Sequence, residues 1–180
     1  MGLDLLLSVG ITVGAWAIPL VWLLGDFGRL PFLFVPGWAS FAYWAAYYAF
    51  GAGAPRWDTV KKVLPCHYLG SLLATLTIWA WLNVGPVNNL SFALWVFPLC
   101  VVMCVMGHIK AFATVPATFF GACISVGVYF LGLANYPDYT PWQNLANMIF
   151  VIPIGSVLGW LSDITALWLA KKPGKRLGEQ

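Results

Sequence analysis

The sequence predicts an all-α polytopic membrane protein with six transmembrane helices, arranged as an inverted repeat of two three-helix halves. Of its 180 residues, 61% are hydrophobic and only 8% are charged, whereas soluble domains carry about 25% charged residues. The apolar runs are long enough for a bilayer, which requires about 20 apolar residues per helix. We therefore expect a single transmembrane domain, with halves at 3–85 and 90–170 and a basic cytoplasmic tail at 171–180.

Six apolar runs separated by short polar turns account for almost the whole chain. We place the predicted spans at 3–24, 31–53, 60–84, 90–110, 114–134 and 141–170. The first run has no basic segment before it and no small-residue cleavage site, so we interpret it as a retained span and not a signal peptide. The four cysteines lie within apolar runs and form no C-x-x-C pair, which implies no disulfide framework.

Short motifs that occur once in each half indicate the repeat. A Val-Pro step opens the second and the fifth run, and a Trp follows each of these runs. Thirteen residues after that Trp comes a Gly-Ser pair, Gly70-Ser71 in the first half and Gly155-Ser156 in the second. Consecutive halves of three spans enter the membrane from opposite sides. The two copies would therefore be related by an axis in the membrane plane, as in many channels and transporters.

The fifth run carries two features of its own. Ala117, Gly121 and Ser125 recur at every fourth position, so they share one helix face that another helix can approach closely. Pro116, like Pro36 in the second run, stands near the start of its span. A proline there either occupies the first helical turn or frees carbonyl groups that line a path.

Three segments resemble one family. They are Val115-Pro116-Ala117-Thr118-Phe119-Phe120-Gly121-Ala122-Cys123, the residues Trp38, Phe41, Ala42 and Tyr43, and Leu167-Trp168-Leu169-Ala170. These segments resemble the small bacterial inner-membrane proteins of the domain of unknown function 1097 family. The resemblance implies six spans and no soluble domain. It brings no catalytic or binding residues, because none is assigned to that family.

The basic residues predict the orientation. With six spans, both termini share one side with the second and fourth loops. That side would hold Arg56, Lys61, Lys62, Lys110 and the four basic residues of the tail, against Arg29 alone on the other side. Because basic loops are retained in the cytoplasm, we expect a multi-pass protein of the bacterial inner membrane with both termini cytoplasmic.

Polar side chains inside the predicted spans are the candidates for function, because they are costly in lipid. His67 either is structural or lines a path, and Asp163 either makes a structural hydrogen bond or lies on the path. Tyr43 and Tyr47, one turn apart, belong to an aromatic belt or face a narrow path. The candidates for the solute path are Pro36, Tyr43, Tyr47, His67, Ser71, Pro116, Thr118, Ser156 and Asp163.

Two further groups of residues have plainer interpretations. Cys100, Cys104 and His108 would share a helix face and could bind a soft metal ion, but cysteine is also a common small hydrophobe in packed interiors. We predict no metal and no cofactor. Asn144 and Asn147 lie at the start of the sixth run, where we interpret them as interfacial turn residues.

No motif indicates an enzyme, since the chain has no phosphate-binding glycine loop, no nucleophile with a plausible base and no loop long enough to host a site. The first hypothesis is a channel or facilitator for a small neutral or weakly charged solute. The alternative is a non-transporting structural or accessory subunit of a membrane complex. The expected partners are membrane lipid, the small solute and a homo-oligomer or larger complex, but no nucleic acid.

Overall fold

The computed structural model describes residues 5–27, 37–50 and 56–170. These ranges consist of helices joined by turns and contain no strand. Pro36 and the basic tail at 171–180 lie outside the described residues. The elements are α1 (Leu5–Phe27), α2 (Gly37–Phe50), α3 (Arg56–Asn83), α4 (Asn89–Met106), the short 3-10 helix η1 (Lys110–Phe112), α5 (Val115–Asn135) and α6 (Pro141–Ala170).

Within the described ranges, four helices are long and apolar enough to cross a membrane, namely α3, α4, α5 and α6. The described part of α2 has 14 residues, which at 1.5 Å per residue span about 21 Å, less than the roughly 30 Å of a hydrocarbon core. In α1 the described apolar stretch is Leu7–Pro19. The predicted spans at 3–24 and 31–53 therefore stay predictions.

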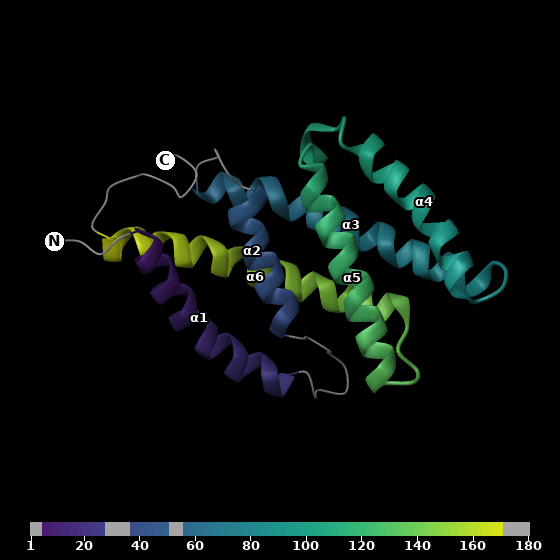
Figure 1. The fold of residues 1–180 in the computed structure, drawn as a ribbon, viewed down its shortest axis with the longest axis horizontal. Helices are drawn as coiled ribbons and strands as arrows, with labels where there is room; N and C mark the ends of the chain where they lie inside the picture. The colour runs from purple at the N-terminus through teal and green to yellow at the C-terminus, as the bar shows by residue number, and fades with distance from the viewer. Residues whose placement is uncertain (1–4, 28–36, 51–55, 171–180) are drawn as a thin grey trace.

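The long helices α3 and α6 form the framework of the molecule (Figure 1). They pack against each other and run in opposite directions, while α5 crosses α3 and α2 crosses α6. The helix α1 packs along α6, where Thr12 donates a hydrogen bond to the carbonyl of Ser162 at 3.4 Å. The helix α4 lies on the outside of α3. The interior is thus formed by α2, α3, α5 and α6.

The helix α4 has an apolar outer face that suits contact with lipid. It begins at a capping box, in which the Asn88 side chain accepts from the backbone N–H of Ser91 and Ser91 accepts from that of Asn88. Beyond the cap, its only buried residues are Leu99 and Met103. Leu90 and Phe97 are 72% and 73% exposed. An outward face this apolar is unsuited to water and typical of contact with a membrane.

Glycines allow the backbones of α3 and α5 to touch where the two helices cross. A Cβ atom placed on Gly121 would meet the backbone of His67, with the Cα atom 2.7 Å away. A Cβ atom on Gly70 would meet the carbonyl of Thr118 and lie 2.7 Å from the amide nitrogen of Ala122. Ala117 and Ser125, on the same face of α5 as Gly121, are fully buried.

The crossing of α2 and α6 is built in the same way. A Cβ atom on Gly155 would lie 2.6 Å from the Cβ atom of Tyr43, and one on Gly159 would lie 2.6 Å from the Cβ atom of Tyr47. Because Gly155 and Gly159 have no side chains, α6 leaves room at these two positions for the large aromatic residues of α2. Tyr43, Trp44 and Tyr47 are each at most 2% exposed as a result.

We predict that Gly121→Ala destabilises the protein by about 1–3 kcal/mol, the usual cost of overpacking, because the added methyl group meets the backbone of α3. Gly127→Ala on the same helix is the matched control, since its methyl group would meet only the Trp38 ring at 3.4 Å. Thermal unfolding in detergent measures both. Equal melting temperatures for the two variants would contradict close packing at this crossing.

Candidate functional site

Polar side chains gather in the interior of the bundle, between α2, α3, α5 and α6. The fully buried members are Ser40, His67, Ser71, Thr75, Thr118, Ser125, Asn144, Ser156 and Ser162. In a membrane the bundle is surrounded by apolar lipid, so polar side chains are expected to face one another inside the bundle. The buried polar groups are therefore concentrated in the interior of the bundle.

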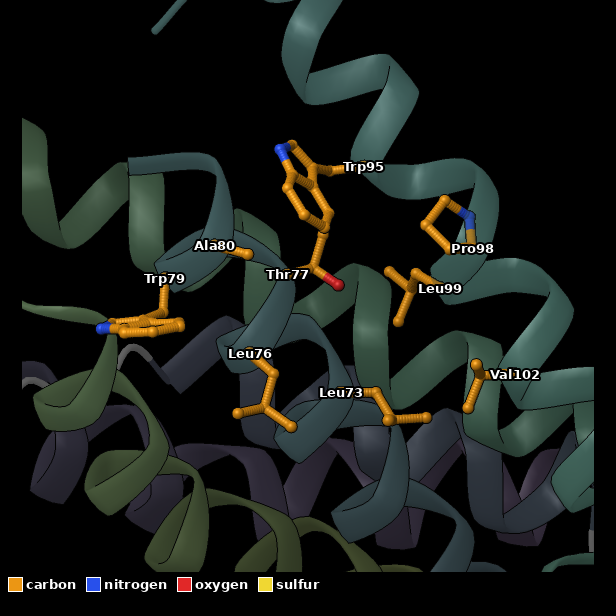
Figure 2. A pocket seen from close by; sticks show the side chains of 9 residues that line it. All are labelled: Leu73, Leu76, Thr77, Trp79, Ala80, Trp95, Pro98, Leu99 and Val102. Carbon is orange, nitrogen blue, oxygen red and sulfur yellow. The ribbon is translucent and has the colours of Figure 1, made fainter. Parts of the chain in front are cut away.

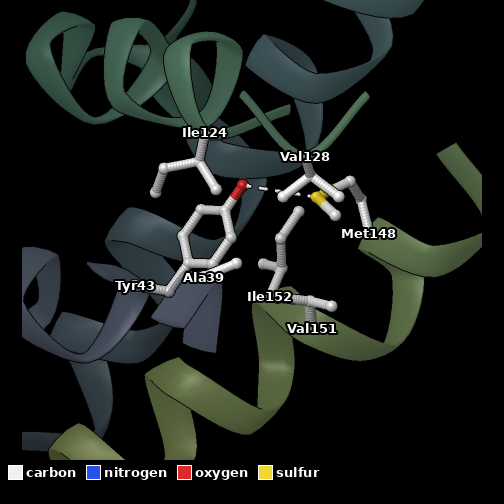
Figure 3. Close-up of a cluster of buried hydrophobic side chains, with 7 residues drawn as sticks. All are labelled: Ala39, Tyr43, Ile124, Val128, Met148, Val151 and Ile152. Atoms are coloured by element: carbon white, nitrogen blue, oxygen red, sulfur yellow. Dashed lines mark hydrogen bonds between the residues drawn. The ribbon is translucent and has the colours of Figure 1, made fainter. Parts of the chain in front are cut away.

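Tyr43 on α2 joins three helices at the centre of this interior. Its hydroxyl lies 3.4 Å from Ser71 Oγ on α3, 3.4 Å from the carbonyl oxygen of Gly121 on α5 and 3.9 Å from the sulfur of Met148 on α6. Figure 3 shows this hydroxyl between the side chains of α5 and α6 in an apolar cluster. One phenol thus brings a polar group into the middle of the core.

His67 on α3 packs beside Tyr43, with the two ring centroids 4.8 Å apart. Its Nδ1 atom lies 2.9 Å from the carbonyl oxygen of Ala117 on α5. Its Nε2 atom is buried and has no hydrogen-bond partner among the described residues. Ser71 lies one helical turn further along α3, so the imidazole and this hydroxyl share a helix face.

Three more buried hydroxyl groups lack a partner within the described part of the chain, those of Ser40, Thr118 and Ser156. All three stand at the glycine crossings. The Ser40 carbonyl faces Gly155, the neighbour of Ser156, and the Thr118 carbonyl faces Gly70, the neighbour of Ser71. Because buried polar groups without partners are rare in native structures, their position at both crossings calls for a functional explanation.

A charged cluster joins α6 to the first turn of α3. The Asp163 carboxylate, in a residue that is 6% exposed, lies 3.5 Å from Arg56 Nε and accepts a hydrogen bond from the Tyr47 hydroxyl at 3.2 Å. The same hydroxyl lies 3.3 Å from the carbonyl oxygen of Arg56. The N-terminus of a helix favours negative charge, so Asp163 holds the start of α3 against α6.

Asn144 and Asn147, expected from the sequence to be interfacial turn residues, lie within α6 and not in a turn. Both are buried. Asn144 donates to the carbonyl and the hydroxyl of Ser125 at 2.9 and 3.0 Å and accepts from the Tyr139 hydroxyl at 3.2 Å, while Asn147 donates to that hydroxyl at 2.6 Å. The i, i+3 spacing of two amides on an apolar helix is the signal that could have revealed this network.

The predicted path residues thus separate into groups. Tyr43, His67 and Ser71 meet at the centre, together with the segment of α5 that carries Thr118. Tyr47 and Asp163 form the charged cluster. The ring nitrogens of His67 do not reach Asp163, because Nδ1 bonds Ala117 and Nε2 has no partner.

Ser156 is fully buried at the crossing of α2 and α6, next to Gly155. Pro116 and the candidate metal ligands, in contrast, lie outside this interior. Pro116 lies in the first turn of α5 and is exposed, where the missing N–H costs nothing. The helix α4 ends at Met106, so His108 lies beyond it and no longer shares its face with Cys100 and Cys104. Among the described residues, no group of three or more His, Cys, Asp or Glu side chains could hold a metal ion.

A groove of about 330 Å³ lies between α3 and α4. Figure 2 shows Leu99 and Val102 of α4 on one side of it and Leu73 and Leu76 of α3 on the other. Its polar side-chain groups are the Thr77 hydroxyl and the indole N–H groups of Trp79 and Trp95; the remaining lining residues are Ala80 and Pro98. A surface of this composition suits acyl chains.

The apolar exterior, the buried polar interior and the four membrane-length helices define a polytopic α-helical membrane protein. The chain belongs to the family described as "Protein of unknown function (DUF1097)", whose family model matches residues 7–167. The resemblance noted in the sequence is thereby confirmed. Comparisons with curated proteins and with solved structures return no match.

We predict that Asp163→Leu destabilises the protein by about 1–3 kcal/mol, less than a fully buried ion pair because the Arg56 side chain is 34% exposed. Asp163→Asn should cost less, since it retains an acceptor for Tyr47. The control is Asp58→Leu, which breaks the exposed pair with Lys61 and should cost at most about 1 kcal/mol. Melting temperatures that rank Asp58→Leu as the worst of the three would contradict this assignment.

Tyr139, in the turn before α6, gives a prediction for alkaline pH. Burial raises its pKa from 10 to about 12, although the hydrogen bond from Asn147 opposes the shift. The folded state therefore holds this proton more tightly, so the stabilisation is complete below pH 10 and is lost as the pH rises toward 12. The unfolding free energy of Tyr139→Phe should fall less steeply than that of the native protein across this range, and parallel curves would contradict the assignment.

Proposed function

We propose that the protein is a membrane channel or facilitator for a small neutral or weakly charged solute, with its path between α2, α3, α5 and α6. The observation that carries this proposal is the set of four buried polar groups without partners at the two glycine crossings, in Ser40, His67, Thr118 and Ser156. The conformation described here is closed at that point, because these side chains are fully buried.

The four buried polar groups that have no partner within the described residues are costly to the folded state. Each buried polar atom without a partner costs about 1–3 kcal/mol, and apolar residues of the same shape would avoid that cost. Intramembrane polar groups are retained where they bind a passing molecule or water. The charged pair Arg56 and Asp163 belongs to a separate cluster at the start of α3, which supports a neutral solute over an ion.

The two crossings also support the inverted repeat. Matching the halves pairs α3 with α6 and α2 with α5, so the crossing of α3 with α5 corresponds to that of α6 with α2. Gly70 then corresponds to Gly155, and Thr118 to Ser40. Ser40 stands four residues after Pro36 and Thr118 two residues after Pro116. The correspondence is therefore offset by two residues from the one that the Val-Pro steps suggest.

Six spans with both termini in the cytoplasm of a bacterial inner membrane complete the proposal. The start of α1 lies beside the end of α6 (Figure 1), where Val9 packs against Leu167 and Ala170. Because the start of α1 and the end of α6 lie on one side, this placement supports an even number of spans. The basic loops and tail make that side cytoplasmic.

The second candidate is a non-transporting accessory subunit, by itself as a homo-oligomer or within a larger membrane complex. The exposed apolar face of α4 and the closely packed glycine crossings favour it. Both candidates lack catalytic chemistry and a cofactor. They differ in whether the interior admits a solute.

Solute flux into liposomes distinguishes the two candidates. We predict that, after the initial osmotic shrinkage in a gradient of urea or formamide, liposomes containing the protein reswell faster than empty liposomes, as measured by stopped-flow light scattering. Thr118→Val and Ser156→Ala should each change that rate several-fold, since they remove path hydroxyls. Thr77→Val, in the outer groove, is the control and should leave the rate unchanged. Rates equal to those of empty liposomes would favour the accessory subunit.

A further inference from the structure

We propose that His67, Tyr43 and Ser71 form a binding site for a small neutral molecule that supplies N–H donors, such as ammonia or a small primary amide. This inference rests on the proposed function and specifies its solute class. It follows from the hydrogen-bonding capacity that these side chains have left after their contacts with the protein are satisfied.

The imidazole of His67 presents a bare lone pair. Its Nδ1 atom bonds the carbonyl oxygen of Ala117 at 2.9 Å, and because a carbonyl can only accept, Nδ1 must carry the proton. In the neutral ring, Nε2 is then an acceptor. This atom is fully buried and has no partner among the described residues, so it can receive an N–H or O–H donor.

The neighbouring hydroxyl groups have committed their protons elsewhere. Ser71 Oγ donates to the carbonyl oxygen of Gly121 at 3.3 Å, and the Tyr43 hydroxyl lies 3.4 Å from the same oxygen. The Tyr43 hydroxyl also lies 3.4 Å from Ser71 Oγ and 3.9 Å from the sulfur of Met148, so the protons of both hydroxyls are used inside the cluster. Each hydroxyl oxygen has two lone pairs, and at least one on each oxygen is left for another donor. With Nε2 of His67, the cluster therefore has an excess of acceptors and a shortage of donors.

The surroundings favour an uncharged ligand. Neither Tyr43, His67 nor Ser71 bonds a carboxylate within the described part of the chain, and a buried cation without a counter-ion is costly. The rings of Tyr43 and Phe120 lie beside the imidazole, with centroids 4.8 and 6.5 Å from that of His67, so its immediate neighbours are aromatic. A small neutral donor matches both the free acceptors and these uncharged surroundings.

Nitrogen-15 NMR of histidine-labelled protein in lipid tests the site directly. The exposed His108 is replaced in a His108→Gln background, so that His67 gives the only imidazole signals. We expect a protonated Nδ1 and a bare Nε2. Titration with formamide should move the Nε2 resonance in a saturable way. The same titration with N,N-dimethylformamide, which has no N–H group, should not.

The flux assay provides the second readout. His67→Phe should lower the ratio of formamide to dimethylformamide permeability by roughly tenfold, the value of one good hydrogen bond. His67→Gln retains one donor and one acceptor and should recover part of the ratio. If His67→Phe does not fold, the NMR titration of the native imidazole still decides.

The two readouts separate the inference from the proposed function. A protonated Nε2, a resonance that ignores formamide, or an equal response to both amides overturns the donor site, even if flux is observed. A resonance that reports only contact with water shows a hydration site and overturns it as well. A saturable, donor-specific response in a protein without flux upholds the site and overturns transport.

Discussion

The close approach of helix backbones at the two glycine crossings is the constraint on which the rest of the structure depends. Gly70 and Gly121 bring α3 against α5, and Gly155 and Gly159 bring α6 against the aromatic residues of α2. In lipid, where apolar side chains gain little by leaving their solvent, such backbone contact is a main source of helix association. The remaining helices, α1 and α4, are added to the outside of this four-helix core.

The crossings also explain why the polar groups are buried. A helix that lies directly on its neighbour's backbone encloses the small residues beside the glycine, and here these are Ser40, Ser71, Thr118 and Ser156. Tyr43 then reaches across from α2 to the carbonyl of Gly121. The proposed solute path would require this contact to loosen, so the feature that stabilises the fold would also control access to the interior.

Much of this arrangement could be predicted from the sequence. The all-helical fold follows from composition and the length of the apolar runs. The regular spacing of Ala117, Gly121 and Ser125 indicates a close-packed face of α5, and these residues are buried. Ile124 and Val128, three and seven residues after Gly121, lie on or beside the same face of α5, and both are buried. They pack with Tyr43 of α2 and Met148 of α6, which the spacing alone did not predict.

The site could be predicted only in part, because sequence shows which residues are polar but not which partners they find. His67, Tyr43 and Ser71 stand out as polar groups in apolar runs, whereas their meeting depends on how α2 crosses α3 and α5. The burial of Asn144 depends on Ser125, 19 residues away. Such pairings between helices are set by crossing geometry, so the spacing of Asn144 and Asn147 can indicate a buried polar face but not the partner that lies across from it.

The most direct test of a solute path through this core is the aqueous accessibility of its hydroxyl positions. In a background where the four native cysteines are replaced by alanine, single cysteines at Ser40, Thr118 and Ser156 are exposed to a small water-soluble thiol reagent in liposomes. The path predicts that these thiols are modified and that a permeant amide slows the reaction, while a cysteine at the buried apolar Val128 stays inert. Thiols at all three hydroxyl positions that are as inert as the one at Val128 would contradict the path and identify the core as solid packing.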